Sequence, residues 1–149
     1  TGWEESRLHI AKLNGNYNLV NSVELNLATH PFAMVSCEDP RLFTFACELY
    51  LSFTGAFLKG GRHFAYPLLC KLDRELQPSS VVSVEYARRT WPMEKNWVYF
   101  EHGGRLLCIY SINPHTILSI KGNRAMGLMV RFPGGYRAVF MAGDQGSKD

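Results

Sequence analysis

The chain has 149 residues, of which 46% are hydrophobic, 13% aromatic and 19% charged. This length and apolar content are enough for one domain with a buried core. Sixteen Lys and Arg against thirteen Asp and Glu leave a formal charge of +3, too small to favour a nucleic-acid-binding protein. No apolar run approaches the roughly 18–20 residues of a membrane-spanning helix, so we expect no membrane span.

Cysteine usage argues against a disulfide framework and against a zinc site. The four cysteines form no CxxC pair, and no histidine lies near them at zinc-finger spacing. Cys47, Cys70 and Cys108 fall in apolar stretches, so we expect buried free thiols. No metal site is predicted. The sequence does not define a compartment, although the lack of an Asn-x-Ser/Thr sequon favours the cytoplasm.

Short runs rich in aromatic and aliphatic residues follow one another along the chain and predict strands. In chain order they are 8–13, 17–27, 42–45, 48–54, 63–72, 81–86, 98–100, 105–111, 116–120, 126–132 and 136–141. Turn-forming pairs such as Asn14-Gly15, Gly60-Gly61 and Gly103-Gly104 separate them. No long apolar stripe with helical periodicity occurs, so the pattern predicts an all-β fold.

An internal repeat links two of these strand pairs. Residues 38–43 lead into 49–53, and residues 94–100 lead likewise into 106–111. The offset is 56 residues at the first element and 57 at the strand. A period near 50 residues with about four short strands is typical of β-propeller blades. The alternative is a coincidental match between two amphipathic strands.

The propeller interpretation divides the chain into parts. We predict a partial propeller domain at 1–142, with one blade at 36–87 and the next at 94–142, and a disordered tail at 143–149. This makes two to three blades, whereas closed propellers have at least four. The missing blades then come from a longer polypeptide or from self-association.

The first chemical cluster is Glu38-Asp39-Pro40-Arg41, which we call the first box. Adjacent strand residues point to opposite faces, so Glu38 and Asp39 cannot both line one pocket by simple alternation. One carboxylate could face a cleft while the other pairs with Arg41. The alternative is a turn in which Asp39 caps the backbone and Arg41 forms a surface ion pair.

The second cluster spans residues 88–97 and ends in Glu94-Lys95-Asn96-Trp97, which we call the second box. Its cations and tryptophans suit a sugar or a phosphate, because indole rings stack on sugars and Arg and Lys bind phosphate. The alternative is a solvated loop whose tryptophans fill the core. In a third cluster, 110–115, Asn113 and His115 could bind a hydroxyl or an anion, or could be turn residues.

The two boxes, each ahead of a matching strand, resemble the five-bladed β-propeller enzymes that act on glycans, above all the β-mannoside phosphorylases (glycoside hydrolase family 130) and their uncharacterised relatives. The similarity covers roughly residues 36–121. It implies a pocket at the propeller axis, with Asp39 in the place of the single catalytic acid. A phosphorylase needs no base, because phosphate is already an anionic nucleophile.

The resemblance leads to a set of expected site residues. The expected catalytic residue is Asp39. The expected substrate-binding residues are Glu38, Arg41, Glu94, Asn96, Trp97 and Asn113. Charge and proximity to the boxes suggest a phosphate-binding set of Arg88, Arg89, Lys95 and His115. The expected partner is an oligosaccharide or glycan, with no cofactor other than inorganic phosphate or a sugar phosphate as co-substrate.

One departure from the family leaves the reaction open. In the phosphorylases the strand matching 107–111 tends to run into a His-Arg-Pro element that helps to hold phosphate. Here the sequence is Tyr110-Ser111-Ile112-Asn113-Pro114, which lacks that cation. A glycoside phosphorylase, a hydrolase, a glycosyltransferase with an activated mannose donor, and a non-catalytic carbohydrate-binding or interaction module all remain alternatives.

Overall fold

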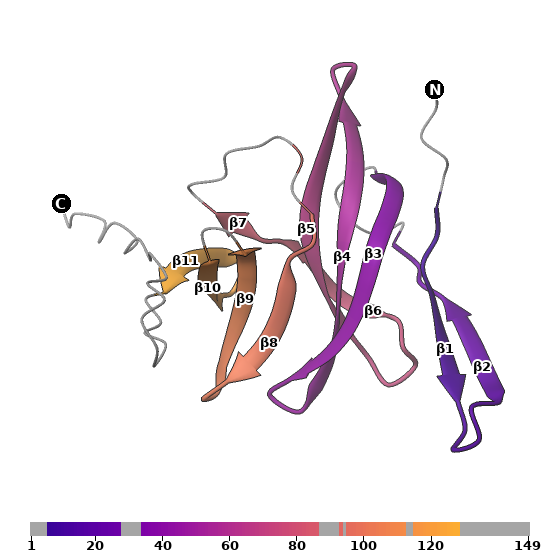
Figure 1. Cartoon of the computed structure of the whole chain (residues 1–149). Coiled ribbons are helices and arrows are strands. Elements are labelled where there is room, and N and C mark those ends of the chain that lie inside the picture. Colours follow the sequence, from indigo (N-terminus) through magenta and orange to yellow (C-terminus); the bar gives the residue numbers. More distant parts are fainter. Residues whose placement is uncertain (1–5, 28–33, 87–92, 94, 113–114, 129–149) are drawn as a thin grey trace.

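The computed structural model describes residues 6–27, 34–86, 93, 95–112 and 115–128. Over these residues the protein is all-β, as predicted: there are eleven strands and no helix. No helix in the described part is therefore long and apolar enough to cross a membrane. Figure 1 shows the strands gathered in three sheets that lie side by side.

The first two sheets are simple antiparallel units. The N-terminal hairpin pairs β1 (His9–Leu13) with β2 (Leu19–Glu24). The central sheet follows the chain in the order β3 (Met34–Phe45), β4 (Glu48–Lys59), β5 (Arg62–Leu72) and β6 (Pro78–Ser83). All of its neighbouring strands are antiparallel.

The third sheet, here the C-terminal sheet, has one strand from an earlier part of the chain. Its order is β7-β11-β10-β9-β8. The strands are β7 (Glu85–Tyr86), β8 (Val98–His102), β9 (Arg105–Ile112), β10 (His115–Lys121) and β11 (Arg124–Leu128). The short β7 leaves the central sheet directly after β6 and pairs in parallel with β11, so it ties the two sheets together at their outer strands.

Both faces of the central sheet are buried, because strand alternation sends side chains to two separate cores. Leu51 and Phe53 pack toward the N-terminal hairpin, whereas Leu69 packs toward the C-terminal sheet. The first core contains Leu8, Ile10, Leu25, Cys37, Leu51, Phe53, Phe57, Leu68, Cys70 and Leu72. The second contains Leu69, Val84, Trp97, Tyr99, Leu106, Cys108, Leu118, Ile120 and Ala125.

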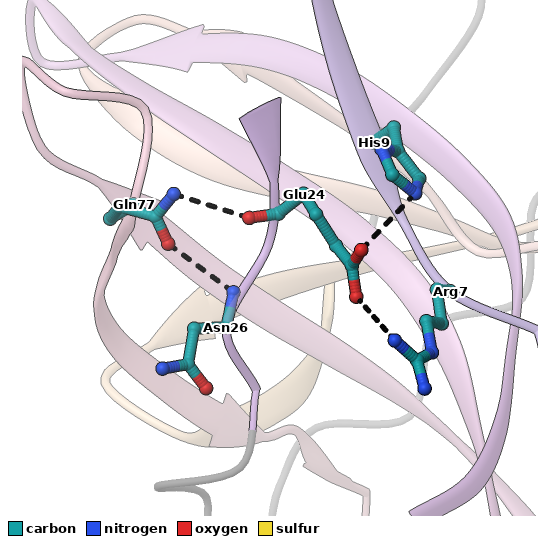
Figure 2. Close-up of polar contacts among 5 residues, drawn as sticks. All are labelled: Arg7, His9, Glu24, Asn26 and Gln77. Atoms are coloured by element: carbon teal, nitrogen blue, oxygen red, sulfur yellow. Dashed lines mark hydrogen bonds and ion pairs between the residues drawn. The ribbon is translucent and has the colours of Figure 1, made fainter. Parts of the chain in front are cut away.

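A side-chain amide fastens the hairpin to the central sheet at its edge. Gln77, between β5 and β6, donates from Nε2 to the carbonyl oxygen of Glu24 and accepts at Oε1 from the backbone N–H of Asn26, both over 3.2 Å. Figure 2 shows this double contact beside the ion pair of Arg7 with Glu24, where the N–O distance is 3.1 Å. These two hydrogen bonds to the backbone therefore hold the hairpin to the central sheet, together with the packing of the first core.

The predicted strands up to residue 128 are confirmed, with different lengths, except that the predicted strand 81–86 is divided between β6 and β7 in two different sheets. Residues 129–132 of the predicted strand 126–132 lie outside the described residues. The main difference is β3, which begins at Met34 rather than near residue 42. The expectation that Cys47 is a buried thiol is wrong: Cys47 is exposed, and with Ala46 it forms the β3–β4 turn, where both have positive φ. The other three thiols are free and buried. The predicted strand at 136–141 and the predicted tail at 143–149 lie outside the described residues.

Candidate functional site

The first box interrupts β3 with a bulge. Glu38 lies opposite Thr54 and Arg41 lies opposite Ser52, so three steps along β3 match two along β4. Pro40 has no N–H to donate to the ladder, and Asp39 takes a left-handed conformation with φ 53°. A bulge breaks the alternation of side chains and can re-aim one of them. The bulge therefore places the adjacent carboxylates of Glu38 and Asp39 in different surroundings.

The second box has a similar backbone feature at the start of β8. Asn96 has φ 67°, again in the left-handed region, which Asn tolerates better than most residues. Trp97 follows and is buried, with its ring set edge-on to the ring of Tyr110 at a centroid distance of 5.3 Å. A fixed indole of this kind forms a rigid wall rather than a mobile surface group.

Two contacts join the boxes. Arg41 donates from Nη1 to the backbone carbonyl of Trp97 over 3.2 Å. Lys95 Nζ lies 3.9 Å from Glu38 Oε2, an exposed ion pair that adds little to stability. The structure therefore brings both boxes to one place, although 56 positions separate Arg41 from Trp97.

Residues of both boxes line one small hollow. The two boxes provide Asp39, Arg41, Asn96 and Trp97, and the neighbouring strands provide Ser52, Phe53, Thr54, Pro67 and Tyr99. Its volume is about 10 Å³, room for a single water molecule. A carboxylate, a guanidinium, an amide, two buried hydroxyl side chains and an indole thus surround a space the size of one hydroxyl group.

This arrangement suits a hydroxylated ligand more than an apolar one. The carboxylate and the amide oxygen accept hydrogen bonds, the guanidinium and the amide nitrogen donate them, and hydroxyls do both. The indole and the ring of Tyr99 offer flat apolar walls. A carboxyl group such as that of Asp39 is also the kind of group that delivers a proton to a leaving oxygen.

The structure describes only some of the remaining expected site residues. Arg88, Arg89, Glu94 and Asn113 lie outside the described residues. His115 begins β10 opposite Ile112, but its side chain is outside the described part. Of the expected phosphate-binding set, only the Lys95 side chain is placed, exposed and next to Glu38.

Sequence reasoning missed the residues that β4, β5 and β8 contribute to the hollow. Ser52 and Thr54 are buried polar residues on β4, 3% and 4% exposed. They alternate with Leu51 and Phe53, so polar residues at every second position of an otherwise apolar strand were the available signal. Of the other missed residues, Phe53, Pro67 and Tyr99, the last belongs to the second core and has no such signal in the sequence.

A larger cleft opens elsewhere, between the outer strands of the central and C-terminal sheets. It measures about 590 Å³ and has an apolar floor that includes Phe45, Leu69 and Ile120. None of the expected site residues in the described part of the chain lines it. Two twisted sheets that meet at β3 and β8 diverge toward their outer strands, which explains the position of the cleft.

The three buried thiols are unsuited to act as nucleophiles near neutral pH. Burial raises the pKa of the Cys37 and Cys70 thiols to about 11 and that of Cys108 further, so all three stay protonated near neutral pH. Among the described residues, no three His, Cys, Asp or Glu side chains gather as a metal site would require. The hollow between the boxes is therefore the strongest candidate site.

Comparison of the chain with protein-family models, with curated protein sequences and with solved structures finds no match. The assignment of a function therefore depends on the geometry of the two boxes and on the sequence resemblance alone.

Proposed function

We propose that the protein is a carbohydrate-active enzyme of the five-bladed β-propeller type, a glycoside phosphorylase, hydrolase or glycosyltransferase that acts on β-mannosides or similar glycans. Asp39 is its general acid. The observation that carries this proposal is the shared hollow, where Asp39 and Arg41 of the first box meet Asn96 and Trp97 of the second. Two segments that the sequence resemblance pairs are thereby neighbours in space.

The stacking of the sheets supports the propeller. Phe43 on β3 and Tyr99 on β8 hold equivalent places in the repeat, and their rings stack at 5.7 Å with an interplanar angle of 11°. Directly after β3, the backbone N–H of Ala46 donates to Glu101 Oε2 on β8 over 3.0 Å. From the first contact to the second the residue numbers rise on both sides, so β3 and β8 run in the same direction where they meet. Blades around a propeller axis place their inner strands side by side in this manner.

In the proposed phosphorolysis, the Asp39 carboxylic acid gives its proton to the glycosidic oxygen as the bond to the anomeric carbon breaks. A phosphate oxygen forms the new bond to that carbon, so the products are a sugar phosphate and a glycan shortened by one residue. Attack by phosphate needs no base. In the reverse direction the same residue, as carboxylate, takes the proton of the acceptor hydroxyl while phosphate leaves.

The other residues have binding roles in this proposal. Asn96 and Trp97 contact the sugar, and Arg41 orients the first box through its bond to the Trp97 carbonyl. Lys95 lies at the rim with Glu38 and is the placed member of the cationic set that would hold phosphate or a donor phosphate. Arg88, Arg89 and His115 complete that set as expectations from the sequence.

Replacement of Asp39 by Asn tests the proposed role. We expect Asp39→Asn to abolish turnover and to leave folding and sugar binding intact, because the amide keeps the shape but has no proton to give at neutral pH. Asp73→Asn is the matched control, since Asp73 is an exposed turn residue that accepts a hydrogen bond from the Gln77 N–H. Full turnover by Asp39→Asn would remove Asp39 from the mechanism.

A non-catalytic carbohydrate-binding module is the second candidate. The observation in its favour is the replacement of the family's His-Arg-Pro element by Ser111-Ile112-Asn113-Pro114. This candidate predicts sugar binding that is lost in Trp97→Ala and unchanged in Asp39→Asn, with no turnover in any variant. Calorimetric titration with manno-oligosaccharides, run beside the turnover assay, separates the two candidates.

A further inference from the structure

Two hydroxyl side chains on β4 point away from the first core. Ser52 and Thr54 alternate with Leu51 and Phe53, whose side chains belong to that core. The two hydroxyl side chains therefore face the C-terminal sheet, and both residues line the hollow between the boxes. They are only 3% and 4% exposed. Polar side chains buried to this extent normally have hydrogen-bond partners, because an unpaired buried hydroxyl has lost its bonds to water.

The two hydroxyls differ in their partners. Ser52 donates from Oγ to the backbone carbonyl of Arg41 over 3.5 Å. In the part of the chain that the structure describes, Thr54 Oγ1 has no hydrogen-bond partner. Nor is this oxygen among the unpartnered polar atoms that are sealed from solvent, so it is accessible from the hollow. Thr54 is thus a buried residue whose hydroxyl keeps both its donor and its acceptor capacity for a group that enters the hollow.

The register places Thr54 beside the bulge of the first box. Thr54 on β4 lies opposite Glu38 on β3, and the next pair along the two strands is Ser52 with Arg41. The bulge between these two pairs carries Asp39, which lines the same hollow. A group that enters the hollow therefore meets the Thr54 hydroxyl close to the proposed acid.

The walls of the hollow limit what can enter it. The volume of about 10 Å³ is room for one water molecule or one hydroxyl group, and a phosphate group is larger than this space. Trp97 and Tyr99 are 3% and 5% exposed and belong to the second core, so they have little room to move aside. A methyl group would fit, but it would leave the Thr54 hydroxyl without a partner. A single hydroxyl group matches both the size and the polarity of the hollow.

We propose that Thr54 is a specificity-determining residue of this site, whose hydroxyl binds the one sugar hydroxyl group that enters the hollow next to Asp39. The inference rests on the proposed function, since it takes the ligand to be a glycan, and it holds for an enzyme and for a binding module alike. Such a site discriminates against an analogue that lacks this one hydroxyl group, because the Thr54 hydroxyl then stays unpaired in the complex.

Calorimetric titration with methyl β-mannoside, and with a series of analogues that each lack one of its hydroxyl groups, tests the proposal. For the unaltered protein we expect the loss of the bound hydroxyl group to weaken binding by about tenfold. In Thr54→Val, which keeps the branched shape but removes the hydroxyl, this penalty should disappear while the penalties for the other hydroxyl groups remain. Thr54→Ser, which keeps a hydroxyl, should retain the penalty.

Thr44→Val is the matched control for this substitution. Thr44 is an exposed residue of the neighbouring strand β3 and does not line the hollow, so the same change there should leave every affinity ratio as it is. Thermal unfolding gives a second readout. The melting temperature of Thr54→Val without ligand should not fall, because within the described part of the chain the hydroxyl that is removed has no hydrogen-bond partner to lose.

Three results would overturn the proposal, and they are distinguishable from one another. Penalties that are all unchanged in Thr54→Val would mean that no sugar hydroxyl group contacts Thr54. Loss of the penalty for several hydroxyl groups at once, with a lower melting temperature, would mean that Thr54 has a structural role, such as holding a buried water. Both of these results leave the proposed function standing. No binding of methyl β-mannoside or of any analogue by the folded, unaltered protein would instead remove the proposed function, and the role of Thr54 with it.

Discussion

Arg41 donates a hydrogen bond from Nη1 to the backbone carbonyl of Trp97, 3.2 Å away, across 56 positions of sequence. That separation equals the offset of the repeat between the first and the second box. The side chain of one repeat thus fixes the backbone of the other at the equivalent residue. Through this contact the bulge that carries Asp39 and the segment before β8 that carries Asn96 border the same hollow.

Removal of this contact should loosen the junction between the two sheets. We expect Arg41→Met to lower the free energy of unfolding by about 1–2 kcal/mol, because the Trp97 carbonyl loses a charged donor. Urea denaturation followed by tryptophan fluorescence measures the change. Arg62→Met, at an exposed turn, should shift stability by less than about 0.5 kcal/mol. Equal effects of the two substitutions would mean that the Arg41 contact does not hold the sheets together.

The stacked rings of Phe43 and Tyr99 should show a measurable coupling in their contributions to stability. Phe43 and Tyr99 stack with 5.7 Å between their ring centroids. A double-mutant cycle with Phe43→Leu and Tyr99→Leu should give a coupling energy of about 0.5–1.5 kcal/mol, as expected for a stacked aromatic pair. Strict additivity of the two single changes would contradict the packing of β3 against β8.

Gly55 is required by close packing in the first core. A Cβ at this position would lie 2.7 Å from Leu68 Cδ1 and 3.0 Å from both Met34 Sδ and Phe57 Cζ. Because Leu68 is fully buried, it has little room to move, and Gly55→Ala should cost about 1–3 kcal/mol. Gly15→Ala is the control, since nothing lies within 4 Å of a Cβ built there. Thermal unfolding of the two variants should separate them clearly.

The buried thiols make stability depend on pH in the alkaline range. Burial raises the pKa of Cys37 and of Cys70 from 9.0 to about 11, for Cys70 with a smaller contribution from Asp73. Above pH 9 the unfolded chain releases these protons while the folded chain keeps them. Stability is therefore complete below pH 9 and is lost as pH rises toward 11, by about 1.4 kcal/mol per pH unit for each thiol.

Cysteine variants test this linkage. Urea unfolding at a series of pH values from neutral to alkaline should show a shallower decline for the Cys37→Ala and Cys70→Ala double variant than for the unaltered chain. Cys47→Ser removes an exposed thiol and serves as the control for cysteine loss. An unchanged slope in the double variant would show that these two thiols are not the groups responsible.

The sequence predicted the strands well, because strand alternation and turn pairs such as Gly60-Gly61 are local signals. The resemblance to a known family, which the two boxes carry, selected Asp39, Arg41, Asn96 and Trp97 as expected site residues. The sequence could not predict the bulge, where the missing N–H of Pro40 and the positive φ of Asp39 act together. The alternation of Ser52 and Thr54 with apolar residues marked them as a polar pair, but their place in the hollow depends on the pairing of β4 with β3.

Cys47 illustrates the limit of composition as a guide to burial. Its neighbours Phe45 and Leu49 are apolar, which predicts a buried thiol, yet Cys47 and Ala46 both adopt positive φ in a two-residue turn. A turn between two long strands lies at the end of the sheet, where side chains reach solvent. The hydrophobic pattern identified the strands but not the residues at which the chain reverses.

The most direct test of the account is a turnover assay on the polypeptide made from the whole reading frame. Mannose 1-phosphate is offered with a panel of sugar acceptors, and release of inorganic phosphate is followed for the unaltered protein, Asp39→Asn and the Asp73→Asn control. The account predicts release by the unaltered protein and by Asp73→Asn, and none by Asp39→Asn. Release at equal rates by all three, or no release from a folded protein that binds sugar, would contradict a phosphorylase that uses Asp39 as its acid.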